Sequence, residues 1–243
     1  MDTQQIQKKY DNLAKNKYVE NYEYHRWFKS SPAKTGYIMT LKAIKGHFLN
    51  GKKFKGSYFE LGPGAGTWTR VMHENSEFDS LKLVDVSENM LEQAKNNLKD
   101  FNDIDYTVSN FLDYIPNKKY DVFFSSRVLE YIPDKQEAVK KIFDMLNNNG
   151  EGYLITKTPK DFINKLLKRK NSRMHQGQVK ACRLKCIFKE VGFREVTEYP
   201  VTISVPVFKS NIINRLVHFI LYRLPLNKLS GFLSESYAIK FKK

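Results

Sequence analysis

The sequence is poor in cysteine and contains no long apolar run. Its only cysteines are Cys182 and Cys186, and their spacing fits neither a CxxC redox motif nor a zinc site. On a helix both thiols would share one face, so we expect two reduced and mostly buried cysteines. No segment approaches the roughly 20 apolar residues that span a bilayer, and the N-terminal residues lack the apolar core of a signal peptide. These absences predict a cytoplasmic protein.

Acidic residues are scarce after residue 150. Residues 1–150 carry 22 Lys and Arg against 20 Asp and Glu, whereas residues 151–243 carry 19 against 6, a net charge of +13. Clustered cations attract anions, so this part of the chain predicts an anionic partner. A phosphorylated or lipid-linked metabolite, a membrane surface and nucleic acid all fit that description. The alternative is that the lysines only solvate the surface.

Apolar strand-like segments alternate with helical patterns along most of the chain. The expected strands are residues 57–62, 81–87, 105–110, 120–126, 151–157, 194–204 and 235–243. Helices are expected before the first strand and between later ones, including a helix over 135–150 that Gly150 would end. This alternation predicts an α/β, Rossmann-like, doubly wound sheet of seven strands. A ligand would bind at the carboxyl ends of its strands.

Glycines concentrate between the first expected strand and the helix that follows. Residues 60–66, ELGPGAG, remove Cβ atoms and leave backbone N–H groups at a helix N-terminus, where a carboxylate or phosphate can bind. Asp85 ends the next strand 19 residues after Gly66, where a carboxylate can accept hydrogen bonds from both ribose hydroxyls. Together these elements predict a nucleotide-like ligand. A nicotinamide oxidoreductase is disfavoured, because its motif requires glycine where Thr67 stands.

These motifs, with LVDVSENML, YTVSNFLDYIP and residues 120–155, resemble the class I S-adenosylmethionine (SAM)-dependent methyltransferases, closely over residues 55–160. The resemblance implies SAM as cofactor, an antiparallel last strand and a helical insertion before it. It implies that the glycine loop contacts the methionine end of SAM, that Asp85 binds the ribose, and that apolar residues cover the adenine. The expected cofactor residues are Glu60, Gly62, Gly64, Gly66, Asp85, Val86, Met90, Asn110, Phe111, Ser126, Arg127 and Tyr18. Asn110 departs from the family, which often has Asp there.

The segment after the fourth strand, SSRVLEYI, corresponds to the part of similar enzymes that lies under the methionine moiety and faces the acceptor. Ser125, Ser126 and Arg127 are therefore candidate site residues, although a serine could cap the next helix and Arg127 could pair with Glu130. His175 follows the fifth strand and is the candidate general base for a hydroxyl acceptor. The alternative for His175 is a plain surface histidine. The remaining histidines show no metal spacing, and no metal site is proposed.

Aromatic residues are frequent in the N-terminal helices. In similar enzymes such helices close over SAM with a tyrosine, and Tyr18 is the candidate here. Tyr10, Tyr18 and Trp27 could instead be core residues, the commoner fate of aromatic stripes. We therefore expect one domain over residues 1–243: a helical cap (1–50), a SAM-binding core (55–160) and substrate-side elements (161–235).

Two segments on the expected substrate side combine basic and apolar residues. They are residues 162–170 and the helical pattern over 211–222. They favour an acceptor with an anionic and an apolar part, and peripheral contact with the inner membrane surface. The alternative is a helix that packs on the core or on a second copy of the chain.

The sequence therefore predicts methyl transfer to an oxygen or nitrogen of a small-molecule acceptor that is anionic or lipid-linked. The Asp/Asn-Pro-Pro-aromatic stretch of amino-methylating nucleic-acid enzymes is missing, as is the Pro-Cys nucleophile of carbon-methylating ones. An RNA methyltransferase that uses the basic C-terminal part is the main alternative, although no RNA-binding module is evident. A binding protein of the same fold without activity is another.

Overall fold

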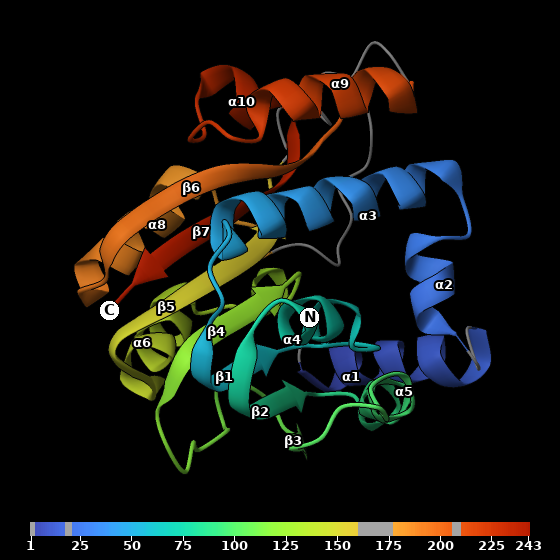
Figure 1. Ribbon diagram of the computed structural model, residues 1–243, viewed down its shortest axis with the longest axis vertical. Helices are drawn as coiled ribbons and strands as arrows, with labels where there is room; N and C mark the ends of the chain where they lie inside the picture. Colours follow the sequence, from blue (N-terminus) through green and yellow to red (C-terminus); the bar gives the residue numbers. More distant parts are fainter. Residues whose placement is uncertain (1–2, 18–20, 160–176, 206–209) are drawn as a thin grey trace.

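The computed structural model describes residues 3–17, 21–159, 177–205 and 210–243, and a seven-stranded sheet forms its centre (Figure 1). The strands are β1 (Lys55–Leu61), β2 (Glu77–Asp85), β3 (Ile104–Val108), β4 (Tyr120–Ser126), β5 (Leu146–Lys157), β6 (Arg194–Ile203) and β7 (Ser234–Lys242). Their order is β3-β2-β1-β4-β5-β7-β6. Neighbouring strands are parallel except that β7 is antiparallel to both β5 and β6. The structure thus confirms the expected Rossmann-like sheet and its antiparallel last strand.

Helices cover both faces of the sheet. They are α1 (Thr3–Asn12), α2 (Tyr22–Trp27), α3 (Ser31–Ala43), α4 (Thr67–Glu74), α5 (Glu88–Asn97), α6 (Lys135–Met145), α8 (Ala181–Val191), α9 (Asn211–Leu221) and α10 (Lys228–Leu233). Short helical turns occupy Leu13–Lys17 (η1), Ile44–Leu49 (η2) and Leu129–Tyr131 (η3). In the described residues, no helix has the length and apolar character needed to cross a membrane.

The central strands β1 and β4 are apolar on both faces, as a parallel strand between two helix layers must be. On one face, Phe59 and Phe123 pack against residues of α6 and α8. On the other face, Tyr58 and Phe124 pack against α3, η2, α4 and α5. Burial of both faces fixes the strand positions, and the carboxyl ends of β1, β2 and β4 therefore meet at one edge of the sheet.

The helix expected over 135–150 is shorter in the structure. It ends at Met145, and Leu146 already has extended backbone and pairs with Tyr120 at the start of β5. Leu146 is fully buried there, so continuing the helix would remove an apolar side chain from the core. The expectation that Gly150 ends the helix is therefore wrong.

Helix α8 also corrects an expectation. It buries Ala181, Leu184 and Phe188 against the sheet, so Cys182 and Cys186 lie together on the outer side. The spacing correctly placed both thiols on one face, but that face is exposed, and the prediction of burial is wrong. Both cysteines are free.

The insertion expected before the last strand is α9 and α10, which follow β6; α9 lies beside α3, and α10 contacts β6 and β7 (Figure 1). The basic and apolar segment at residues 162–170, in contrast, lies outside the described residues. So do Tyr18 and His175.

Candidate functional site

A pocket of about 280 Å³ opens at the carboxyl ends of β1, β2 and β4. Its walls come from α1, α2, the β1–α4 loop, the end of β2, the residues after β3 and the turn after β4. This is the edge of the sheet at which the strand pattern predicts a ligand. Nine of the expected site residues line it: Gly62, Gly64, Asp85, Val86, Met90, Asn110, Phe111, Ser126 and Arg127.

The three glycines of the β1–α4 loop all have left-handed backbone, but for different reasons. A Cβ on Gly62 would lie 2.1 Å from Val128 Cγ2, and one on Gly66 would lie 2.8 Å from Leu98 Cδ1. Both glycines therefore serve close packing, and Gly66 caps α4 outside the pocket lining. A Cβ on Gly64, whose φ is 55°, would have no atom within 4 Å. Of the three, Gly64 is therefore the glycine whose missing side chain leaves open space in the pocket.

Asp85 joins this loop to the end of β2. Its Oδ2 accepts a hydrogen bond from the Gly64 N–H at 3.3 Å, and its Oδ1 accepts one from the Ser87 N–H at 3.0 Å. Burial raises the pKa of Asp85 to about 6, against the lowering effect of these N–H groups. The carboxylate keeps further lone pairs that can accept hydrogen bonds from hydroxyls of a ligand.

Glu60, the acid before the glycines, lies in the core and outside the pocket lining. Tyr58 and Thr69 each donate a hydrogen bond to its Oε2 at 2.7 Å, which ties β1 to α4. Burial raises the pKa of Glu60 to about 7, although these two hydrogen bonds lower it. Its Oε1 has no partner among the described residues. The structure thus places Glu60 behind the glycine loop.

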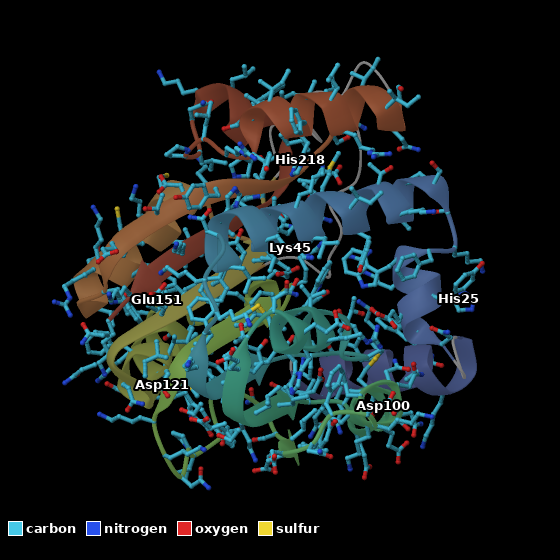
Figure 2. All side chains as sticks on the ribbon, in the orientation of Figure 1. His25, Lys45, Asp100, Asp121, Glu151 and His218 are labelled. Carbon is cyan, nitrogen blue, oxygen red and sulfur yellow. The ribbon has the colours of Figure 1, made fainter. Side chains whose placement is uncertain are left out.

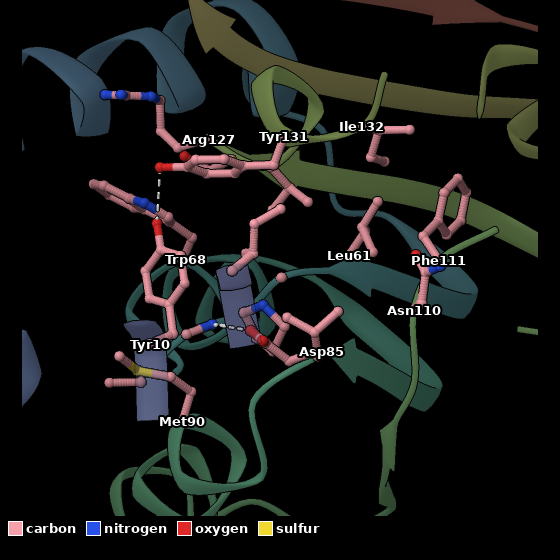
Figure 3. Close-up of a pocket in the computed structure, with 18 of the residues that line it drawn as sticks. Tyr10, Leu61, Trp68, Asp85, Met90, Asn110, Phe111, Arg127, Tyr131 and Ile132 are labelled. Carbon is pink, nitrogen blue, oxygen red and sulfur yellow. Dashed lines mark hydrogen bonds between the residues drawn. The ribbon is translucent and has the colours of Figure 1, made fainter. Parts of the chain in front are cut away.

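Asn110 and Phe111 form one end of the pocket, and Tyr10 and Tyr131 lie at the other, with Asp85 between them (Figure 3). The Asn110 amide donates to Asp113 Oδ2 at 2.8 Å, and its Oδ1 accepts only a long bond of 3.4 Å from the Leu112 N–H. That oxygen can still accept a hydrogen bond from an amino group.

The N-terminal helices close one side of the pocket. Thr3, Ile6 and Tyr10 of α1 line it at spacings of three and four residues, so one face of the helix covers the site. Asp11 holds this helix down, because its Oδ1 accepts hydrogen bonds from Ser87 Oγ at 2.6 Å and from Asn89 Nδ2 at 2.8 Å. In the sequence, the spacing of Thr3, Ile6 and Tyr10 was the signal that could have identified this covering face.

Sequence reasoning therefore missed several residues of this wall. Tyr10 and Trp27 were weighed as core aromatics but line the pocket, as do Tyr22 and Arg26. Trp27 is also buried against Trp68, with ring centroids 5.1 Å apart. Both alternatives hold for Trp27, because one side chain can pack in the core and still form part of a wall.

Arginine and tyrosine side chains gather near the turn after β4. Arg127 has left-handed backbone with φ of 68°, and its Nε donates to Glu130 Oε1 at 2.6 Å. The expected alternative, a pair with Glu130, is thus present although Arg127 also lines the pocket. Burial alone would lower the pKa of Arg127, but the pair with Glu130 outweighs it and raises the pKa. Ser125 is buried and donates to the Leu61 carbonyl at 3.0 Å, which leaves Ser126 at the pocket.

Arg26 differs from Arg127 in having no ion pair with a carboxylate of the described residues. Its guanidinium lies 4.1 Å from the centroid of the Trp27 ring. Burial and the nearby charge of Arg127 lower its pKa. Tyr10 donates to the Tyr131 hydroxyl at 3.0 Å, and burial raises the pKa of Tyr10 well above its usual value. This end of the pocket therefore offers positive charge and hydroxyl donors.

No metal centre accompanies the pocket within the parts of the chain that the structure describes. There, no three His, Cys, Asp or Glu side chains gather in a group that could hold a metal ion. The described histidines also lie away from the pocket lining.

Comparison with known proteins agrees with this geometry. A family model described as a methyltransferase domain matches residues 59–151. Those residues include the glycine loop, Asp85, Asn110 and Arg127. These residues are therefore similar to a methyltransferase domain, and the whole chain shares its fold with SAM-dependent methyltransferases. The cofactor of this class is SAM, as the glycine loop and Asp85 led us to expect.

Relatives of this methyltransferase domain act on different acceptors. Malonyl-[acyl-carrier protein] O-methyltransferase 1 of Ilyobacter polytropus is 28% identical over 104 residues, which are 43% of this chain and 39% of that protein. The match therefore spans about two-fifths of that relative. The N-methyltransferase NodS of Bradyrhizobium japonicum, solved with S-adenosylhomocysteine, has a TM-score of 0.63 at 14% identity over 100% of this chain and 99% of that one.

A third similar protein, by its structure, is phosphoethanolamine N-methyltransferase 2 of Haemonchus contortus, solved with SAM. It has a TM-score of 0.63 at 16% identity, over 96% of this chain and 59% of that one. At such identities the two solved structures establish a shared fold.

The described residues fit SAM. The open space at Gly64, the hydrogen-bonding capacity left on Asp85, and the apolar Met90 and Phe111 match the ribose and adenine. The positive charge of Arg26 suits the carboxylate of an amino acid.

Proposed function

We propose that this methyltransferase transfers the methyl group of SAM to an oxygen or nitrogen of a small-molecule acceptor, and that the acceptor is anionic. One observation carries the proposal: a single pocket joins the open glycine at Gly64 and Asp85 to an end that holds Arg26, Arg127 and partly buried tyrosines. A cradle for a nucleoside thus lies next to a site for an anion.

We propose that SAM lies along the pocket with its adenine near Asn110 and Phe111 and its ribose at Asp85. Val86 and Met90 would cover the adenine, and Gly62, Gly64 and Ser126 would face the methionine end. In Figure 3, Asn110 and Phe111 lie at one end of the pocket and Asp85 lies further along it, which is the order that the adenine and the ribose would follow. Glu60 and Gly66 would support the loop from behind.

We propose that Arg26 holds a carboxylate, from SAM itself or from the acceptor. Arg26 is half-buried and has no acidic partner among the described residues, and a carboxylate can accept two hydrogen bonds from its guanidinium. Arg127 is already neutralised in part by Glu130 at 2.6 Å, so Arg26 is the cation with more left to offer. The substitution Arg26→Gln separates the two sources: it raises the KM for SAM or the KM for the acceptor.

The described pocket residues favour an acceptor that is already nucleophilic. When bound, SAM supplies an electrophilic methyl group, so the protein mainly has to align the acceptor and exclude water. Burial keeps Tyr10 and Tyr131 protonated, because it raises the pKa of both hydroxyls. Asp85 is engaged with backbone N–H groups. An ionised carboxylate needs no general base, and the malonyl-[acyl-carrier protein] O-methyltransferase relative supports an oxygen acceptor of this type.

The test is methyl transfer from labelled SAM to a pool of metabolites and lipids. A methyl ester releases its label as volatile methanol in alkali, whereas a methylamine keeps it. We expect alkali-labile label in acidic, lipid-linked or carrier-linked products. Alkali-stable label on amines would move the proposal to nitrogen, and the absence of any labelled product in the presence of SAM binding would favour a binding protein without activity.

RNA remains the alternative acceptor, because residues 151–243 carry the net charge of +13. RNA binding would be strongly salt-dependent and would gain label in structured RNA. We favour the small molecule because the cations at this pocket lie among tyrosines in a confined space. Residues 1–50 would then cap SAM, residues 55–160 would hold it, and residues 161–235 would face the acceptor and, for a lipid-linked one, the inner membrane surface.

A further inference from the structure

Helices α9 and α10 turn large apolar side chains outward. Seven such side chains between residues 212 and 232 are each 50% to 79% exposed: Ile212, Leu216, Phe219, Ile220, Leu224, Leu229 and Phe232. We call them the α9–α10 apolar face. A cluster of this kind on a protein surface marks an interaction site more often than a scatter of single residues does.

The polar side of α9 is the side that packs on the protein. His218 is buried and lies between α9 and the body of the molecule (Figure 2). Tyr222, one turn later, stacks on it with ring centroids 5.2 Å apart. The Tyr222 carbonyl also accepts a hydrogen bond from His47 Nε2.

Tyr222 also fills the space over Gly46, where a Cβ would lie 2.9 Å from its ring. These contacts fix the rotation of α9 with its apolar side toward solvent. Leu221 is the one apolar side chain of α9 that is buried, whereas an ordinary surface helix turns its whole apolar stripe to the core.

Positive charge surrounds the α9–α10 apolar face. The sequence has no Asp or Glu between Tyr199 and Ser234, and none between Tyr24 and Phe59, the stretch that contains α3. Arg215, Arg223 and Lys228 are exposed on the α9–α10 segment itself. From α3, Lys42 places its Nζ 5.1 Å from the centroid of the Phe219 ring. The surface formed by α9, α10 and the adjoining α3 therefore carries apolar side chains and cations but no Asp or Glu.

We propose that the α9–α10 apolar face is a docking surface for an anionic lipid bilayer. Side chains such as Phe219 and Ile220 would enter the boundary between head groups and acyl chains, while Lys and Arg contact the phosphates. A second copy of the chain fits less well, because a symmetric contact would bring identical cations together. A neutral apolar partner would leave the surrounding cations without counter-charges.

The docking surface meets the pocket wall at the corner between α2 and α3. Asn211, at the start of α9, donates a hydrogen bond from Nδ2 to Ser31 Oγ at 2.8 Å. Ser31 begins α3, and the preceding α2 contributes Arg26 and Trp27 to the pocket. A bilayer at this surface would lie beside the pocket. This link to a lipid-linked acceptor rests on the proposed function, whereas the docking itself does not.

The experiment is co-sedimentation of the full chain with phosphatidylcholine vesicles, with and without phosphatidylglycerol, at low and high salt. We expect binding to the anionic vesicles at low salt and release at high salt, because screening shortens electrostatic attraction. Phe219→Ser/Ile220→Ser should weaken binding roughly tenfold or more. The matched control is Ile115→Ser, which removes an apolar side chain that is 85% exposed elsewhere and should change nothing.

A second pair of variants tests the charge. Arg215→Gln/Lys228→Gln should weaken vesicle binding roughly 30-fold, at the energy typical of a cation near an anionic surface. Lys99→Gln/Lys140→Gln removes the same charge from exposed sites on other elements and should leave binding nearly unchanged. All four variants should bind SAM as the wild type does.

Three results would overturn the docking proposal. They are failure of the wild type to sediment with anionic vesicles, equal binding by the α9–α10 variants and their controls, and a concentration-dependent dimer that Phe219→Ser/Ile220→Ser abolishes. The last result would assign the face to a second copy. If the wild type does not bind SAM, the proposed function is rejected, but the result with vesicles still stands.

Discussion

Replacing Gly64 with alanine separates a ligand-facing glycine from one that serves a turn. Gly64 has φ of 55° and open space where a Cβ would lie. Gly51 provides the matched control, because its φ is 75°, it also has nothing within 4 Å, and it lies outside the pocket lining. Alanine in left-handed backbone costs about 1 to 2 kcal/mol at either position. For a chain of this length each kcal/mol lowers Tm by about 2 to 4 °C, so both variants should lose similar thermal stability without ligand.

Binding should distinguish the two variants. The Gly64 N–H donates a hydrogen bond to Asp85 at 3.3 Å, so the two residues lie side by side in the pocket wall. A methyl group on Gly64 would therefore project into the space that SAM would occupy next to Asp85. We expect Gly64→Ala to bind SAM at least tenfold more weakly in calorimetry, which is about 1.4 kcal/mol, and Gly51→Ala to bind it normally. Valine is a poorer probe, because a β-branched residue is strained further at positive φ. Normal SAM affinity in Gly64→Ala, or equal losses in both variants, would refute a ligand-facing role for Gly64.

Three further substitutions test the pocket and its support. Asp85→Ala should lower SAM affinity at least tenfold in calorimetry, since it removes charge-assisted hydrogen bonds; in the wild type, affinity should fall about tenfold per pH unit below 6 as the carboxylate protonates. A flat pH profile from pH 7 to 5 would contradict this role. Asp11→Ala should weaken SAM binding without touching SAM, because α1 loses its bonds to Ser87 and Asn89; unchanged affinity would mean that α1 needs no such anchor. Glu60 is protonated more readily when folded, so it stabilises the fold at low pH, and that contribution disappears as pH rises from about 4.5 through 7. Between pH 5 and pH 8, the free energy of unfolding in urea of Glu60→Gln relative to wild type should rise by about 2 to 3 kcal/mol, and a pH-independent difference would contradict the raised pKa.

The sheet and the centre of the site could be predicted because both depend on local patterns. Seven apolar segments became seven strands, and strand ends that meet at one sheet edge brought Asp85 to the glycine loop, where the Gly64 N–H now bonds it. The glycines were not distinguishable from sequence. Only the packing of Val128 and Leu98 shows that Gly62 and Gly66 avoid clashes, while Gly64 faces open space.

The remaining features depend on how elements dock, which periodicity does not encode. The spacing of α9 defined an apolar and a polar side, but contacts with His47 and Gly46 decide that the polar side packs inward. The same holds for Cys182 and Cys186, which share the outer face of α8. The position of α1 over the pocket depends on Asp11 meeting residues that are far along the chain.

The central claim is that the pocket binds SAM through Asp85 and the glycine loop, and calorimetry of the wild type with SAM and with NAD tests it most directly. We predict saturable SAM binding that Asp85→Ala weakens at least tenfold, with no comparable binding of NAD. Preferential binding of NAD, or SAM affinity that Asp85→Ala leaves unchanged, would contradict it.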